Sequence, residues 1–65
     1  GVIARYTILK PVRVFDKPSG SAAFVGTLRP GHVIGVTGRF GGFFSYRADG
    51  ACRFVANIKG ALQKK

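Results

Sequence analysis

Short runs of alternating apolar and polar residues follow one another along this chain, and glycine or proline separates them. Val, Ile, Phe, Tyr and Thr fill the runs, and helical spacing of apolar positions is almost absent. Such runs between turn residues are typical of the short strands of a β-sandwich or β-barrel. The pattern therefore predicts an all-β domain. We expect its strands at residues 2–9, 12–15, 23–28, 32–37, 43–47 and 52–56.

Turn-forming residues mark the boundaries between these runs. Pro30-Gly31 predicts a type II turn, because glycine adopts the positive φ of the second central position at little cost. Asp49-Gly50 predicts a tight two-residue hairpin, and residues 38–42 read as a glycine-rich hairpin loop. At the end of the chain we expect a single helical turn over residues 57–62 and a frayed basic tail over residues 63–65.

The length of 65 residues predicts one domain, spanning residues 1–65. A domain of this size buries only about 60% of the surface that its unfolded chain exposes, so its core is thin. Cys52 is the only cysteine and His32 the only histidine, which leaves no internal disulfide and too few ligands for a structural zinc ion. Stability must come from the small core or from packing into an assembly. The sequence leaves open whether the leading strand, within residues 1–9, pairs in its own sheet or adds to a neighbour's.

The charge of the chain is strongly one-sided. Eleven Lys and Arg residues face two acids, Asp16 and Asp49, which gives a formal net charge of +9. Such a domain attracts polyanions: nucleic acid, an anionic membrane surface, a wall polymer or an acidic protein face. The cations are spread along the whole chain, as they would be on a merely solvated surface, but ordinary surfaces mix both signs. The basic residues that we expect to contact a partner are Arg39, Arg47, Arg53, Lys64 and Lys65.

Catalytic chemistry finds little support in the sequence. General acid–base catalysis needs positioned titratable groups, whereas Asp16 and Asp49 both sit in turns. The serines have only His32 as a conceivable base and lack a G-x-S-x-G motif. A pairing of Cys52 with His32 has no local support. We therefore expect a protein that is not an enzyme and that uses no cofactor and no metal.

Aromatic and basic residues are interleaved in the second half of the chain. Arg39-Phe40, Tyr46-Arg47 and Arg53-Phe54 each place a cation beside a ring. Single-stranded nucleic acids are bound by such pairs, since rings stack on bases and cations follow phosphates. The alternative is that most rings fill the core, and we expect Phe24 and Phe44 to do so. The phenylalanines that we expect in a surface cluster are Phe15, Phe40, Phe43 and Phe54.

The order of these segments resembles the bacterial SH3 (SH3b-like) domain family. The stretches that carry the resemblance are VRVFDKPS at 12–19, FVGTLRPG at 24–31, VIGV at 33–36, GGFFSY at 41–46, DG at 49–50 and RFV at 53–55. The resemblance implies a small SH3-like barrel of five to six short antiparallel strands, and in many relatives it implies binding to peptidoglycan. Phe43 and Phe54 stand where the family has tryptophan, Phe15 where it has arginine, and Arg53 where it has glycine. These departures fall where ligand surfaces tend to lie.

A second, shorter resemblance covers residues 30–43, PGHVIGVTGRFGGF. This stretch is similar to the KOW motif of SH3-like ribosomal and transcription-elongation domains. The motif implies the same class of barrel, docked on RNA or on ribonucleoprotein. The two resemblances therefore agree on the fold and differ on the ligand.

Together these features predict a non-catalytic SH3-like binding or structural module. We expect it to dock into a larger protein assembly, such as a virion in which it is a small component, through its aromatic and basic surface and an exposed strand edge. The first alternative is a protein that binds nucleic acid without sequence specificity, and the second is a cell-wall targeting domain. A homo-oligomer is also compatible with the sequence. No signal peptide and no transmembrane segment are visible, so we expect a location in the cytoplasm or within a virion.

Overall fold

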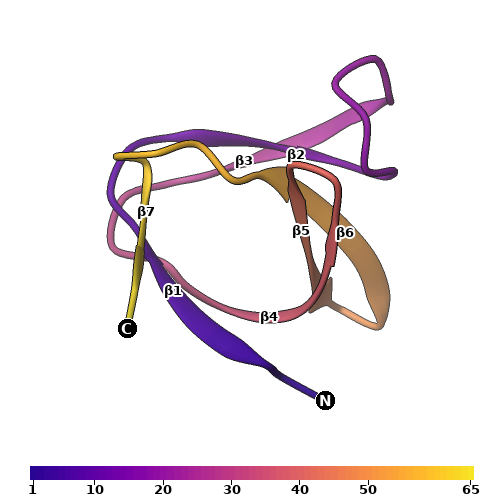
Figure 1. Cartoon of the computed structure of the whole chain (residues 1–65). Helices are drawn as coiled ribbons and strands as arrows, with labels where there is room; N and C mark the ends of the chain where they lie inside the picture. Colours follow the sequence, from indigo (N-terminus) through magenta and orange to yellow (C-terminus); the bar gives the residue numbers. More distant parts are fainter.

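The computed structural model describes residues 1–65 and contains seven β-strands and no helix (Figure 1). This confirms the all-β class predicted from the sequence, and a strand forms in each of the six predicted segments. The strands are β1 (Ala4–Ile8), β2 (Val12–Phe15), β3 (Phe24–Leu28), β4 (Val33–Phe40), β5 (Phe43–Ala48), β6 (Ala51–Ala56) and β7 (Leu62–Lys64).

All seven strands belong to one sheet with the order β3-β2-β6-β5-β4-β1-β7. Each pair of neighbouring strands is antiparallel. The sheet curls, as Figure 1 shows, and the molecule extends 26 × 24 × 23 Å. The edge strands β3 and β7 do not pair with each other, so hydrogen bonds do not close the sheet into a barrel.

The two ends of the chain lie side by side in this sheet. β1 pairs with β4 on one side and with β7 on the other, so the leading strand stays within its own sheet. The residues predicted as a helical turn and a frayed tail instead carry β7, the seventh strand. Burial explains the difference: Ala61 lies in the core, Leu62 packs beside Ile8, and the amide of Leu9 donates to the Ala61 carbonyl at 2.7 Å. An apolar anchor thus orders the basic tail.

The core fills the concave side of the sheet. Alternation along the strands places Val12 and Val14 of β2, and Ile34 and Val36 of β4, on this side, as their spacing predicts. Phe44 is 3% exposed and is core as predicted. The ten buried apolar residues are Ile8, Val12, Val14, Leu28, Ile34, Val36, Phe44, Tyr46, Val55 and Ala61.

Phe24 is not in the core, contrary to the prediction, and its side chain is 57% exposed. Val14 pairs with Gly26, but the next residue, Phe15, pairs with Phe24, so the register shifts and Val25 is left over. Because residues directly opposite one another share a face, this irregularity places Phe24 on the side of Phe15, away from the core. The sequence gives no sign of the extra residue, and without it alternation points Phe24 inward.

The predicted turns have the backbone angles that their residues suggest. Gly31 has a φ of 94°, as the second central position of a type II turn requires. Asp49 and Gly50 have φ values of 51° and 78°, and two positive angles in succession are the mark of a type I′ hairpin turn. β4 runs further than predicted, to Phe40, because a second register shift after Val36 keeps it paired with β5. The loop predicted at residues 38–42 therefore shortens to its last two glycines.

Candidate functional site

The convex side of the sheet carries a set of outward-facing phenylalanines. Phe15 of β2 lies opposite Phe54 of β6, and Phe43 of β5 lies opposite Phe40 of β4. Their sequence neighbours on these strands include the core residues of the other face. Since successive strand residues point to opposite faces, Phe15, Phe43 and Phe54 lie on the side away from the core. Phe40 lies on the same side because the register shift after Val36 leaves it opposite Phe43; without that shift, alternation from Val36 would point it inward.

Phe24 of β3 completes the set through the register shift described above. Five neighbouring strands, in the order β3-β2-β6-β5-β4, thus each contribute one ring to the same side of the sheet. We call this surface the phenylalanine face. Its five residues are Phe24, Phe15, Phe54, Phe43 and Phe40.

Four of the rings form two edge-to-face pairs. Phe15 and Phe43 have ring centroids 6.1 Å apart at an interplanar angle of 81°, and Phe40 and Phe54 have centroids 5.7 Å apart at 79°. This geometry is favoured by the charge distribution of aromatic rings. Close packing also depends on Gly38, where an added Cβ would lie 3.1 Å from the Phe40 ring. The rings are therefore positioned by one another and by the small residue beneath them.

These rings remain open to solvent. Phe24 and Phe40 are 57% and 49% exposed, and Phe15, Phe43 and Phe54 are half-buried. Scattered exposed apolar residues are normal on a protein surface, but five rings gathered on one side of a sheet make this surface a candidate for an interaction site. The structure thus brings together the four phenylalanines expected in a surface cluster and adds Phe24, which the sequence assigned to the core.

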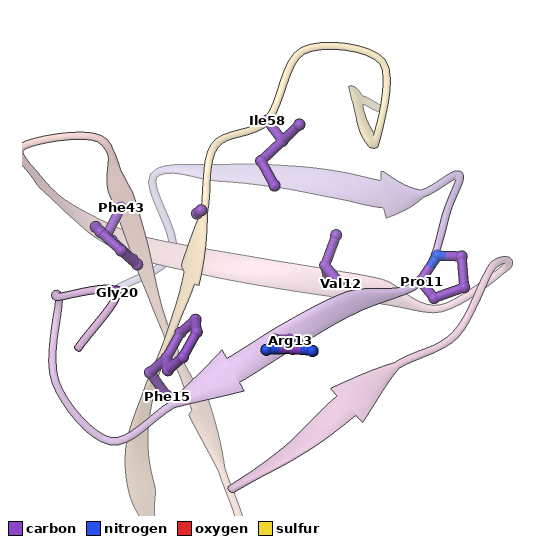
Figure 2. Close-up of a pocket in the computed structure, with 8 residues that line it drawn as sticks. Pro11, Val12, Arg13, Phe15, Gly20, Phe43 and Ile58 are labelled. Carbon is purple, nitrogen blue, oxygen red and sulfur yellow. The ribbon is translucent and has the colours of Figure 1, made fainter. Parts of the chain in front are cut away.

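A groove of about 380 Å³ opens at one end of the phenylalanine face. It forms where β2 and β6 separate: the two strands pair only at Val14 and Phe15, and β6 ends at Ala56. Figure 2 shows Phe15 and Phe43 toward one end of the groove and Pro11 at the other. The apolar side chains that line it are Pro11, Val12, Phe15, Phe43, Ala56 and Ile58.

Two arginines lie on the phenylalanine face. Arg13 lines the groove, and its guanidinium carbon lies 5.5 Å from the centroid of the Phe24 ring, a cation–π contact. Arg47 shares a side of β5 with Phe43 and donates a hydrogen bond from Nη2 to the Gly50 carbonyl at 2.9 Å. Arg47 was predicted at the site from the sequence, whereas Arg13 was not. Its position two residues before Phe15 on a strand is the signal that could have found it.

The other basic residues expected at the site lie elsewhere. Arg53 pairs with Tyr46 and so faces the core side of β6; burial raises the pKa of Tyr46, and the positive charge of Arg53 lowers it in part. Arg39 reaches over the opposite face of β5, with its guanidinium carbon 5.9 Å from the centroid of the core residue Phe44. Lys64 lies on the edge strand β7, at the end of the sheet away from β3, and Lys65 follows it. The predicted basic set thus surrounds the molecule and does not form one patch.

The titratable residues weighed for catalysis and metal binding lie on the surface. His32, Cys52, Asp16 and Asp49 are all exposed. No three His, Cys, Asp or Glu side chains gather closely enough to hold a metal ion. The structure also has no helix with the length and apolar character that crossing a bilayer requires.

Comparison with known proteins identifies no relative of this chain. No protein-family model, curated protein or solved structure matches the chain. The features that bear on function are thus the phenylalanine face, the groove at its end and the excess of positive charge.

Proposed function

We propose that this chain is a non-catalytic SH3-like binding module that docks into a larger protein assembly through the phenylalanine face. The observation that carries the proposal is the row of five outward rings on five neighbouring strands. Three features support the SH3-like barrel: the order of the sequence motifs, the Asp49-Gly50 hairpin and the single curled antiparallel sheet. The molecule is also nearly equal in its three dimensions.

Burial of these rings would supply the affinity. Aromatic side chains dominate the energetics of protein interfaces, with a few central residues contributing most. Covering the exposed part of Phe24 and Phe40 would contribute on the order of 1 kcal/mol for each ring. Exposed rings of this kind lower the solubility of a free monomer, and a partner that covers them removes this disadvantage.

Positive charge would orient the partner. The net charge of +9, with Arg13 and Arg47 on the phenylalanine face itself, favours an acidic protein surface. Charge complementarity mainly raises the association rate and selects among partners, while the rings hold the complex. We propose a virion as the assembly because the protein is small and strongly basic.

Direct nucleic-acid binding is the second candidate, and the cation–π contact of Arg13 with Phe24 favours it. Such pairs on a strand can stack a base and hold a phosphate. The two edge-to-face pairs weigh against it, because in each pair one ring covers a flat side of the other that stacking would need. For duplex DNA this candidate requires the logarithm of affinity to fall with the logarithm of salt at about 0.9 per phosphate neutralised, so a flat dependence would remove it.

The proposal is tested by native mass spectrometry of the untagged protein purified at physiological salt together with the molecules bound to it. We expect a protein partner to remain attached to the parent chain, and the Phe24→Ser/Phe40→Ser variant to bind it at least about tenfold more weakly. A Val2→Ser/Ile3→Ser variant is the matched control, because these two side chains are exposed to a similar extent outside the phenylalanine face.

Circular dichroism establishes that both variants are folded before binding is compared. A parent chain that stays monomeric and without a partner would contradict the proposal. Equal loss of binding in the control would also contradict it, because the contact would then not depend on the phenylalanine face.

A further inference from the structure

The groove at the end of the phenylalanine face has the apolar lining of a receptor for a side chain. Its volume of about 380 Å³ lies at the low end of the range for ligand pockets. The walls are apolar except for Arg13. Ile58, which forms one wall, is 54% exposed and has no partner in the core. The space therefore suits a compact apolar group.

We infer that this groove receives one apolar side chain from an extended, acidic segment of the partner protein. The inference rests on the proposed docking function and names the chemistry of the partner at one point of the interface. Three features of the groove, its walls, its charge and the open side of β2, lead to it.

The walls favour an apolar side chain over a nucleobase. The edge of a base carries several hydrogen-bonding groups, and these lose free energy when they leave water without new partners. Among the side chains around the groove, only Arg13 offers hydrogen-bond donors, and it offers no acceptor. A leucine or phenylalanine side chain leaves no polar group unsatisfied there, and its burial against Val12, Ala56 and Ile58 is favourable.

The charge of the groove favours a carboxylate next to that side chain. Arg13 is exposed, and its contact in the isolated chain is with the Phe24 ring. The planar guanidinium of an arginine binds carboxylates through paired hydrogen bonds. Neither of the two acids of the chain, Asp16 and Asp49, lines the groove, so Arg13 is free for an acid of the partner.

The edge of β2 favours an extended segment. Pairing with β6 covers only Val14 and Phe15, so Val12 and Arg13 have no strand on that side. A peptide that lies along this part of β2 in an extended conformation can place alternate side chains in the groove and beside Arg13. The three features thus converge on an acidic strand-like segment with a single apolar anchor.

The inference is tested with four probes: the peptide Asp-Glu-Phe-Glu-Asp, its analogue with Ala in place of Phe, its analogue with Lys in place of every acid, and oligothymidylate. Binding is measured by amide chemical-shift titration of the isotope-labelled chain. We expect the first peptide to shift amides of residues 12–15 and 56–58. We expect the Ala and Lys analogues each to bind at least about tenfold more weakly.

Two substitutions link the peptide to the groove. Ile58→Ser and Arg13→Gln change exposed side chains outside the core, and each is expected to weaken the first peptide at least about fivefold. Ile3→Ser is the control, because Ile3 is exposed to a similar extent as Ile58 and lies outside both the phenylalanine face and the groove. This control is expected to leave the affinity for the peptide within about twofold of the parent value.

The outcomes separate the groove from the docking function. The inference is overturned if the first peptide shifts no groove amides, if the Lys analogue binds as well, or if oligothymidylate alone shifts them. It is also overturned if Ile58→Ser binds peptide and native partner like the parent chain. In that case the docking function still holds if the Phe24→Ser/Phe40→Ser variant loses the partner. If that variant keeps the partner, the docking function is contradicted together with the inference.

Discussion

Phe43 and Phe44 are neighbours in the sequence but lie on opposite faces of β5. Phe44 points to the concave side, where it is buried and 4.8 Å from the Tyr6 ring by centroid distance. Phe43 points to the convex side, where it packs edge-to-face on Phe15 and stays half-buried. Residue type is therefore a poor guide to the role of a ring in this domain. The face of the strand decides whether a phenylalanine stabilises the fold or is available to a partner.

The largest difference in stability between the two faces is expected for a substitution in the core. Phe44→Ala removes a ring from a close-packed interior, so we expect the free energy of unfolding to fall by about 3–5 kcal/mol. Phe40→Ala on the convex side is expected to lower it by less than about 1 kcal/mol, because the ring is 49% exposed. Urea denaturation followed by circular dichroism measures both.

A 65-residue domain has only about 3–10 kcal/mol of stability in total. We therefore expect Phe44→Ala to be largely unfolded in water. Similar losses at Phe40 and Phe44 would show that the convex rings also belong to the core, and the distinction between the two faces would fail.

A smaller effect is expected beneath the rings of the convex face. An added Cβ at Gly38 would lie 3.1 Å from both the Phe40 ring and Ser45 Oγ, so Gly38→Ala must displace a ring or a buried hydroxyl. We expect a loss of about 1 kcal/mol of stability. Gly26→Ala in β3 is the control, because nothing lies within 4 Å of its added Cβ. If Gly38→Ala were as stable as Gly26→Ala in urea denaturation, the close contact of the Phe40 ring with Gly38 would be contradicted.

The smallest effect concerns the concave face at alkaline pH. Burial raises the pKa of Tyr46 above its ordinary value of 10.0, although Arg53 opposes the shift. The folded state therefore favours the neutral phenol, and its contribution to stability is complete below pH 10 and is lost as pH rises through the raised pKa. We expect the melting temperature of the parent chain to fall more steeply above pH 10 than that of Tyr46→Phe.

The same titration can be followed directly by the ultraviolet absorbance of tyrosinate. A Tyr46→Phe variant whose melting temperature falls with pH as steeply as that of the parent chain would contradict the burial of this hydroxyl.

Alternation along the strands made much of the fold predictable. Val12, Val14, Ile34 and Val36 alternate with polar or small residues, and all four lie in the core. The Asp49-Gly50 hairpin was predictable because few residues accept two positive φ angles in succession. β7 was not predictable in this way, since it depends on the distant pairing of Leu62 with Ile8.

The candidate site was predictable only in part, and register explains why. Phe15, Phe43 and Phe54 could be grouped from their places in the strands, and Phe40 was expected at the surface from its place in a predicted loop. The orientation of Phe24 could not be predicted, because the extra residue between Gly26 and Phe24 reverses it, and such an irregularity has no sequence signal here. A second irregularity, after Val36, likewise turns Phe40 outward from a strand that continues beyond its predicted end. The groove escaped prediction as well, since it arises where two strands that are far apart in the sequence separate.

Cys52 offers the most direct test of whether a partner covers the phenylalanine face. This exposed thiol lies two residues before Phe54 on the same side of β6, so a maleimide can report on the surface. The control is Gln63→Cys in a Cys52→Ser background, which places a thiol on β7, at the end of the sheet away from β3. If docking uses the phenylalanine face, the assembly should slow modification of Cys52 by at least about tenfold relative to the free chain, and slow the control less. Equal rates at Cys52 in the free and assembled protein would contradict the account.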